Sequence, residues 1–267
     1  MPDRSVVFCD GNTGELRRWA EGTVSTYART GGSPWGAALG GEGCVYVAQA
    51  GGACESADAG ARSGIQRVRS GGQVELLTSQ AGGVDLVAPN DLAFGPDGRL
   101  YLTDSGMECA EPAATRSPGR ILALGASHGE QLAQRPLAYP NGIAFDRDGR
   151  LHWTESLSRR ICRLEAGRIV IVAQLDDRHI PDGMAFALDG RIFVCTTSSK
   201  TVTVVSPDGE LLGAIPIGAY PTNCAFDGSV LYVTATTTAE IRFDERTGSL
   251  WSVETDAVGL PCQTGVL

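Results

Sequence analysis

The chain has 267 residues, and its 31 acidic side chains outnumber its 22 basic ones, which gives a formal net charge of −9 at pH 7. This excess of negative charge argues against a nucleic-acid partner, because such a partner requires a basic face. The 35 glycines, the 13 prolines and the 20% share of charged residues favour many short strands joined by tight turns. We expect a single domain over residues 1–267, since all-β domains often reach this size.

The sequence gives no sign of membrane insertion or export. No run of 18 or more apolar residues occurs, so no transmembrane helix is predicted. The first 19 residues lack both the basic opening and the long apolar run of a signal peptide. We therefore expect a cytoplasmic protein that has no membrane partner.

Five segments of the chain repeat one pattern of a Pro, a short apolar strand, a turn and a second apolar strand. The turn is often Asp-Gly, a strong hairpin signal between two apolar runs, because Gly readily adopts positive φ. In chain order the segments are SPWGAALGGEGCVYVAQA (33–50), APNDLAFGPDGRLYLTDS (88–105), YPNGIAFDRDGRLHWTES (139–156), IPDGMAFALDGRIFVCTT (180–197) and YPTNCAFDGSVLYVTAT (220–236). Weaker, more polar strands follow the hairpins.

The later repeats start about 40 residues apart, a period that with four strands per unit is typical of propeller blades. The next start is due at Leu260, where the chain supplies LPCQTGVL, and the second strand of that blade matches SVVFCD at 5–10. The sequence therefore predicts an all-β, six-bladed β-propeller of four-stranded antiparallel blades, with one blade closed by N- and C-terminal strands. A β-sandwich is the alternative, but it does not predict complementary chain ends.

Two longer spacings place extra residues at 51–64 and 106–120, directly after the second strand of a blade. Since the first and second strands are antiparallel, both insertions overhang the face where the first strands begin. Long loops on one face of a rigid scaffold usually serve binding, although decoration without a role is the alternative. Cys54 and Cys109 lie in these loops and could pair if the loops meet.

The residue after each repeated Pro marks the entrance to the innermost strand, beside the central channel. Around the ring these residues are Trp35, Asn90, Asn141, Asp182, Thr222 and Cys262. Each alone would be an ordinary turn residue. Three adjacent blades, however, bring Asn, Asn and Asp to one mouth of the channel, and such oxygen atoms are what a hard cation such as calcium prefers. The pattern predicts a divalent-cation site, with Trp35 and Thr222 among the substrate-binding residues.

The ends of the second strands form another set of equivalent positions on the same face. Asp104 and Glu155 belong to it, and we interpret them as substrate-binding charges at the mouth or as caps of the strand ends. His179 precedes Asp182 by three residues and is a candidate for proton transfer, or else a solvent-facing loop residue. His152 shares the position of Tyr46, Tyr101, Phe193 and Tyr232, which indicates an aromatic packing role.

Segments 89–106, 139–156 and 180–190 resemble the family of senescence marker protein, gluconolactonase and luciferin-regenerating enzyme. The resemblance covers most of the chain. It implies a six-bladed propeller with a divalent cation, often calcium, that hydrolyses lactones and related esters. It also implies that Asn141 and Asp182 are metal ligands, that Asp182 is the catalytic acid/base, and that Asn90 lines the substrate pocket near the metal.

The sequence departs from this family at two places. The family's metal-binding Glu, usually in a Glu-Gly-Pro stretch just before the strand matching Val6–Cys9, does not occur here, and Cys262 or Gln263 covers its ring position. A thiolate suits zinc better than calcium, so zinc is the alternative metal, and the cation is absent if the missing Glu is essential. The family's sugar-lactonases often carry an Arg where this chain has Ala88, which argues for a less polar substrate.

Three functional hypotheses follow from the residues and the resemblance. The first is a metal-dependent hydrolase of a lactone or related ester, with a small-molecule substrate and Asp182 as acid/base. The second is a metal-independent cyclase, isomerase or lyase of a specialised pathway that uses Asp182, His179 and Cys262 in the same pocket. The third is a non-enzymatic propeller that binds a ligand through the face with the long loops.

Overall fold

The computed structural model describes residues 1, 3–52, 60–106, 117–126, 128–237 and 247–267. The chain divides into two compact units: unit 1 contains Met1–Leu137 and Cys262–Leu267, and unit 2 contains the described residues of 138–261. Cys54, Cys109 and most of the two predicted binding loops lie outside the described residues. The expectation of a single domain stays a prediction.

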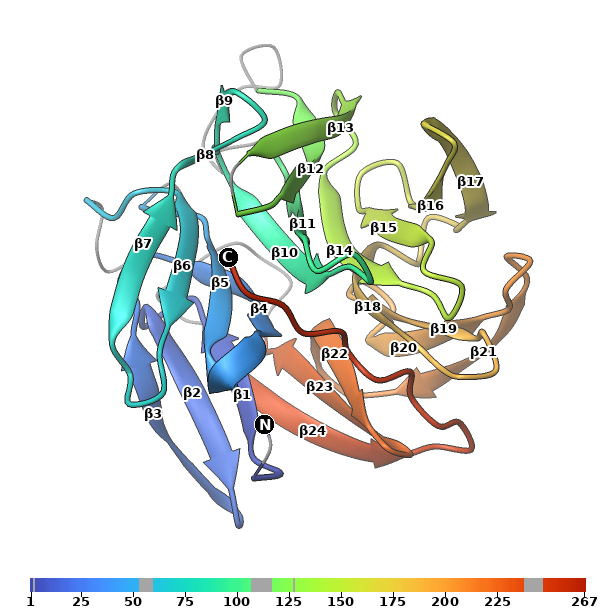
Figure 1. The fold of residues 1–267 in the computed structure, drawn as a ribbon. Coiled ribbons are helices and arrows are strands. Elements are labelled where there is room, and N and C mark those ends of the chain that lie inside the picture. The colour runs from blue at the N-terminus through green and yellow to red at the C-terminus, as the bar shows by residue number, and fades with distance from the viewer. Residues whose placement is uncertain (2, 53–59, 107–116, 127, 238–246) are drawn as a thin grey trace. The chain divides into compact units, whose positions relative to one another are not determined.

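Unit 1 holds three antiparallel sheets (Figure 1). The first contains β1 (Val6–Asp10), β2 (Glu15–Ala20) and β3 (Thr23–Arg29). The second contains β4 (Pro34–Leu39), β5 (Val45–Gln49), β6 (Gly64–Val68) and β7 (Val74–Thr78), with the 3₁₀ turn η1 (Gly41–Gly43) between its first two strands. The third contains β10 (Pro89–Phe94), β11 (Leu100–Asp104), β12 (Gly119–Leu124) and β13 (Gly129–Arg135), beside the small pair β8 (Gln80–Ala81) and β9 (Val84–Asp85).

Unit 2 also holds three antiparallel sheets. They contain β14 (Pro140–Phe145), β15 (Leu151–Glu155), β16 (Arg160–Glu165) and β17 (Arg168–Gln174), then β18 (Pro181–Phe186), β19 (Ile192–Thr196), β20 (Thr201–Val205) and β21 (Leu211–Pro216), then β22 (Tyr220–Asp227), β23 (Val230–Thr236) and β24 (Gly248–Glu254). The predicted fold class is confirmed: the chain is nearly all-β, and its six sheets are the blades of a six-bladed propeller. Four blades have four strands, and two have three among the described residues.

The repeated Pro interrupts each first strand at its start. The ladder between the first and second strands shifts register just after Pro34, Pro89, Pro140, Pro181 and Pro221. Proline lacks the amide hydrogen that a ladder needs, and a β-bulge redirects the side chains that follow it. The residue after each Pro is thereby released from regular pairing.

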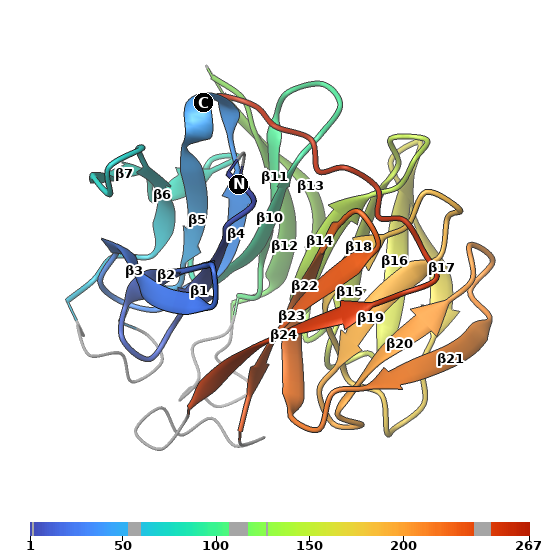
Figure 2. The ribbon, with the colours of Figure 1, turned by 90° about the horizontal axis from the view of Figure 1, so that it is seen from below.

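Within each unit the first strands of neighbouring blades approach closely, as β4 and β10 do in Figures 1 and 2. A Cβ atom built on Gly36 would lie 2.7 Å from the Cα of Asp91. One built on Gly142 would lie 2.6 Å from the carbonyl oxygen of Asp182. A side chain at either glycine would therefore push the neighbouring strand away.

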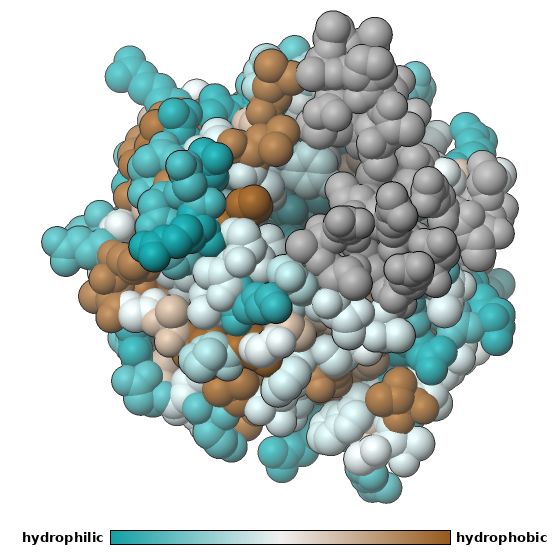
Figure 3. Space-filling view, turned by 180° about the vertical axis from the view of Figure 1, so that it is seen from behind, coloured by the Kyte–Doolittle hydropathy of each residue, from teal (hydrophilic) through white to brown (hydrophobic). Residues whose placement is uncertain are grey.

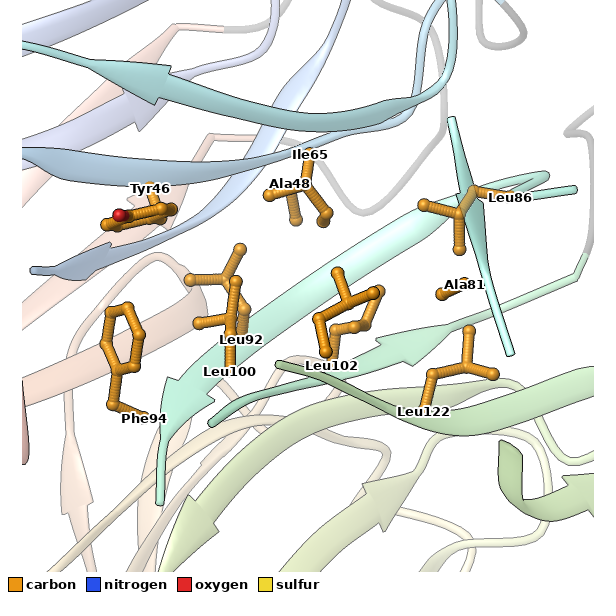
Figure 4. Close-up of a cluster of buried hydrophobic side chains, with 11 residues drawn as sticks. Tyr46, Ala48, Ile65, Ala81, Leu86, Leu92, Phe94, Leu100, Leu102 and Leu122 are labelled. Atoms are coloured by element: carbon orange, nitrogen blue, oxygen red, sulfur yellow. The ribbon is translucent and has the colours of Figure 1, made fainter. Parts of the chain in front are cut away.

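In three blades the aromatic residue of the second strand packs against a Phe at or near the end of the next blade's first strand. In unit 1, Tyr46 meets Phe94 edge-on at a centroid distance of 5.1 Å, within the buried cluster of Figure 4. In unit 2, His152 meets Phe186 at 4.9 Å, and Phe193 meets Phe226 at 5.0 Å. Such edge-to-face pairs stabilise a core beyond the area they bury. The prediction that His152 fills an aromatic packing slot is confirmed.

The predicted closure of one blade by the two chain ends is wrong. Among the described strands, β1 pairs with β2 alone, and residues 260–267 form no strand. In unit 1 the tail instead hydrogen-bonds to turns and side chains: the amide of Gly41 donates to the carbonyl of Gly265 (2.7 Å), and the amide of Leu267 donates to the Tyr46 hydroxyl (2.9 Å). In unit 2 the amide of Leu260 donates to the carbonyl of Phe186 (2.8 Å).

Two surface features bear on the sequence predictions. Among the described residues, no helix has the length and apolar character needed to cross a membrane. On the face drawn in Figure 3, the described hydrophobic residues form small separate patches among hydrophilic ones. Scattered exposed hydrophobic residues of this kind are ordinary on protein surfaces.

Candidate functional site

We call the "Pro end" of a blade the end where its first strand begins after the repeated Pro and its second strand stops. The residues predicted from the sequence divide between the units. Unit 1 contains Trp35, Asn90, Asp104 and Cys262, and unit 2 contains Asn141, Glu155, His179, Asp182 and Thr222. Each group is described within its own unit, so the prediction that Asn90, Asn141, Asp182 and Cys262 share one metal stays a prediction.

Asn141 and Asp182 belong to one hydrogen-bond network at the Pro ends of two neighbouring blades. The side-chain amide of Asn141 donates to the hydroxyl of Ser156 (3.1 Å), which donates in turn to the carbonyl of Pro181 (2.7 Å). The hydroxyl of Thr154 donates to the carbonyl of Asp182 (2.7 Å). The β14–β15 hairpin therefore fixes the backbone on both sides of Asp182.

This network engages the amide nitrogen of the Asn141 side chain. Because the Asn141 amide nitrogen serves Ser156, the amide oxygen is the atom that can act as a ligand. Asn141 is buried, whereas Asp182 is only half-buried. Asp182 thus combines a fixed backbone with a side chain that a small molecule can approach.

His179 lies on the segment that leads into β18. Its Nδ1 is 2.6 Å from the Oδ1 of Asp176, and its side chain is 14% exposed. The hydrogen bond with His179 lowers the pKa of Asp176, with a further contribution from the amide of Arg178. Asp176 is therefore the group that orients His179, and the proposed proton transfer by His179 stays a prediction.

Thr222 occupies the equivalent position at the start of β22. Its hydroxyl lies 3.0 Å from the Thr234 hydroxyl and 3.2 Å from the Thr234 carbonyl, across the β22–β23 pair. The residue is half-buried. Thr222 therefore places a polar, partly accessible group at a third Pro end of unit 2, while its role in substrate binding stays a prediction.

In unit 1, Asn90 makes the same contact as Asn141. Its side-chain amide donates to the hydroxyl of Ser105 (3.0 Å), and both residues are buried. Trp35 is half-buried, and a Cβ atom built on Gly11 would lie 3.6 Å from its ring. The loop after β1 therefore packs against Trp35 and restricts the positions that the ring can take.

Cys262 is a free cysteine in the C-terminal tail, where the residue is exposed to solvent. Desolvation of its sulfur by surrounding protein atoms nevertheless raises the pKa of the thiol. The two statements are compatible, because the exposure is that of the whole residue, whereas the pKa depends on the surroundings of the sulfur atom. A protonated thiol is a weak metal ligand and a weak nucleophile.

The structure gives Asp104 a clear structural role, and its predicted part in substrate binding stays a prediction. Its side chain is fully buried, and its carboxylate accepts hydrogen bonds from the amides of Val87 (3.0 Å), Ala88 (2.8 Å) and Gly106 (3.1 Å). Arg120 lies 3.7 Å from the same carboxylate. Asp104 therefore holds the segment that leads into β10, which is the capping role considered above as its alternative.

Glu155 also has structural contacts of this kind, and its predicted part in substrate binding likewise stays a prediction. It is fully buried, and its carboxylate accepts hydrogen bonds from the indole of Trp153 (3.1 Å) and the hydroxyl of Ser158 (2.5 Å). Its acceptor atoms are thus directed at neighbouring side chains of its own blade. Buried carboxylates persist when they are hydrogen-bonded in this way, which supports the strand-cap role considered above as the alternative.

The oxygen ligands available in unit 2 are of the type that a divalent cation prefers, but they carry little negative charge. Asn141 and Asp182 offer an amide oxygen and a carboxylate, the hard ligands that calcium prefers. The described residues contain no group of three or more His, Cys, Asp or Glu side chains that could hold a metal. A cation in unit 2 would therefore be held by Asn141 and Asp182, with one carboxylate among them.

Sequence reasoning missed the serines that orient the two asparagines. The signal was present in the repeat, because each Pro-Asn pair is matched by an acidic residue and a serine where the second strand ends: Asp104-Ser105 and Glu155-Ser156. Reading the two strands of a hairpin as antiparallel neighbours would have placed each serine beside its asparagine.

The fold and these contacts define a propeller protein whose Pro ends carry ordered amides, hydroxyls and a half-buried carboxylate. The chain belongs to the SMP-30/gluconolactonase/LRE-like family, whose model matches residues 2–237. It is 26% identical to regucalcin of Sus scrofa over 159 residues, which are 54% of this chain and 53% of that protein. The match therefore spans about half the length of this relative.

Solved structures share the fold. A gluconolactonase from Xanthomonas campestris is 24% identical with a TM-score of 0.72, and the match covers 88% of this chain and 80% of that one. Regucalcin from Agrobacterium tumefaciens strain C58, described as a calcium-binding protein, is 16% identical with a TM-score of 0.75, over 99% and 90% of the two chains. At these identities the likeness concerns the fold alone.

Proposed function

We propose that this protein hydrolyses a lactone or a related ester, with Asp182 as the acid/base. The observation that carries the proposal is the network of Asn141, Ser156 and Thr154, which fixes the backbone around a half-buried carboxylate. Membership of a family that is named in part for gluconolactonase supports the reaction class. The substrate is a small molecule.

The reaction adds water to the ester carbonyl and breaks the bond to the alkoxide oxygen. The Asp182 carboxylate accepts a proton from the attacking water and returns it to the departing alkoxide, so the residue ends the cycle ionised. A fixed backbone helps, because general acid/base catalysis needs the carboxylate within hydrogen-bond reach of the water. The Asn141 amide oxygen, on the neighbouring first strand, can orient that water.

The proposal includes a divalent cation, calcium in the first place and zinc as the alternative. Asn141 and Asp182 would hold it, and it would polarise the carbonyl and lower the pKa of a bound water. Because the pair supplies one carboxylate, we expect weaker calcium binding than at a site with several. The name of the Agrobacterium relative, a calcium-binding regucalcin, supports the choice of metal.

A lactone panel tests the proposal. Acid release from an aldonolactone, an aliphatic γ-lactone and an aryl ester would be followed at constant pH, with protein treated with chelator and then supplied with calcium or zinc. We expect hydrolysis of at least one substrate, restored by one of the metals. In the Asp182→Asn variant we expect the rate to fall by about 100-fold or more.

Asp189→Asn is the matched control, because Asp189 lies at the opposite end of the same β18–β19 hairpin, where it pairs with Arg191. This control should keep the wild-type rate. No hydrolysis of any substrate, or equal rates for Asp182→Asn and Asp189→Asn, would contradict the proposal.

A further inference from the structure

Lys200 is the single lysine in a chain with 22 basic residues. It lies in the turn between β19 and β20, at the Pro end of that blade, and its side chain is exposed. Its Nζ lies 4.5 Å from the centroid of the Tyr220 ring, so the ammonium group is held over the start of the next blade's first strand. Among the described residues it has no ion-pair partner.

Arg159 occupies the same position in the preceding blade of unit 2. Both residues have left-handed backbone, with φ of 54° at Arg159 and 58° at Lys200. Both carbonyls accept the amide of the residue that follows the fourth strand, Leu175 (2.8 Å) or Ile217 (3.0 Å). The two turns differ in charge balance, because Arg159 pairs with Asp177 at 3.2 Å and Lys200 has an aromatic ring in place of a carboxylate.

A second polar group lies beside the same ring. Tyr220 and Thr236 are directly opposite each other in the β22–β23 pair, so their side chains leave the sheet on the same face. The Thr236 hydroxyl is buried and has no hydrogen-bond partner among the residues that the structure describes. A buried hydroxyl without a partner is costly, and the cost disappears when a ligand accepts its hydrogen bond.

We propose that Lys200 and Thr236, which both lie next to Tyr220, form a subsite for a carboxylate group of the substrate. The Lys200 ammonium supplies the positive charge, the Thr236 hydroxyl donates a hydrogen bond, and the Tyr220 ring limits the directions from which the carboxylate can approach. Lys200 contributes more to carboxylate binding than a freely moving surface lysine would, because its contact with Tyr220 fixes the position of the ammonium group. The identity of the ligand as a substrate rests on the proposed function, and the substrate class becomes a lactone or ester that carries a carboxylate.

Paired substrates test the subsite. The ratio of kcat/KM for a γ-lactone with a carboxylate substituent to that for its methyl-capped, neutral analogue would be measured in four variants. We expect Lys200→Gln to lower this ratio about tenfold, mainly through KM, and Lys200→Arg to keep most of it. Thr236→Val should lower it severalfold, and Arg159→Gln, the matched control, should leave it unchanged. Equal ratios in all four variants would overturn the subsite.

A binding experiment separates failure of the subsite from failure of the proposed function. Because Lys200 is the single lysine, acetylation at this position can be followed by peptide mass mapping, apart from the N-terminal amine. Glutarate, a dicarboxylate probe, should slow acetylation of Lys200 at least threefold in the wild-type protein and not in Thr236→Val. Protection without any lactone hydrolysis would support the subsite and contradict the hydrolase, whereas hydrolysis without protection would contradict the subsite alone.

Discussion

The two strand ends that meet at each Pro end offer acidic and amide residues in very different environments. Where second strands stop, Gln49, Asp104, Glu155 and Thr196 are all fully buried, and their side chains serve the neighbouring backbone or side chains. Where first strands begin, Trp35, Asp182 and Thr222 are half-buried. Asn90 and Asn141 at first-strand starts are buried as well, so the contrast concerns the carboxylates: Asp104 and Glu155 support the fold, whereas Asp182 is the more accessible.

Removing one carboxylate from each environment gives the largest expected effect. Asp104→Ala leaves three amides and Arg120 without their acceptor in a buried site, so we expect the free energy of unfolding to fall by about 3–5 kcal/mol. Asp182→Ala should change it by less than about 1 kcal/mol, because the residue is half-buried. Urea denaturation of both variants measures the contrast, and comparable losses of stability would refute the distinction between the two strand ends.

His152, which lies in β15 away from the Pro end, is expected to make the stability of the protein depend on pH. Burial lowers the pKa of His152 to about 4, against an ordinary value of 6.5. Below pH 6.5 the unfolded chain therefore binds a proton that the folded protein refuses until about pH 4, so stability falls as the pH falls through this window. We expect a loss of about 2 kcal/mol between pH 7 and pH 5.

His152→Phe supplies the control for this effect, because Phe193 occupies the equivalent slot of the next blade. The variant keeps the aromatic contact with Phe186 and loses the titrating ring. Denaturation curves at pH 7 and pH 5 should show a smaller pH dependence for the variant by about the same 2 kcal/mol. An unchanged pH dependence would mean that other groups carry it.

The smallest expected effects come from removing the serine hydroxyl of each asparagine–serine pair. Ser156→Ala removes a hydroxyl that joins Asn141 to the carbonyl of Pro181, so we expect about 1 kcal/mol of lost stability and a fall in kcat of about tenfold. Ser156→Thr should restore much of kcat, since it returns the hydroxyl.

Ser105→Ala is the matched change in unit 1, where the serine orients Asn90. We expect a similar loss of stability but an effect mainly on KM, because Asn90 is the predicted pocket residue. Steady-state kinetics on one lactone measure both parameters for both variants. If Ser156→Ala and Ser105→Ala changed kcat and KM to the same extent, the proposed difference in role between Asn141 and Asn90 would be contradicted.

The sequence was informative wherever one residue type recurs in one environment. The Asp-Gly hairpins, the blade period and the aromatic slot of His152 could be predicted because each depends on a local pattern that the repeat displays several times. The environments of Asp104 and Glu155 could not, since alternation along a strand does not tell whether its last side chain turns back toward the backbone or out to a ligand.

The C-terminal tail shows a second limit of sequence patterns. Spacing predicted a strand at 260–267, but the tail follows a long-range choice of partners. Leu267 bonds to Tyr46, which lies 221 residues away along the chain. Neither the apolar residues of the tail nor the repeat period specifies which distant residues such a segment will contact.

One measurement tests the central claim most directly: hydrolysis of a lactone in water enriched in oxygen-18, with the product analysed by mass spectrometry. The account predicts that the product of each turnover carries one oxygen-18 atom in its carboxylate, and that Asp182→Asn forms this product at least about 100-fold more slowly. A product isomeric with the substrate and free of label would contradict hydrolysis and would favour an isomerase, cyclase or lyase reaction in the same pocket.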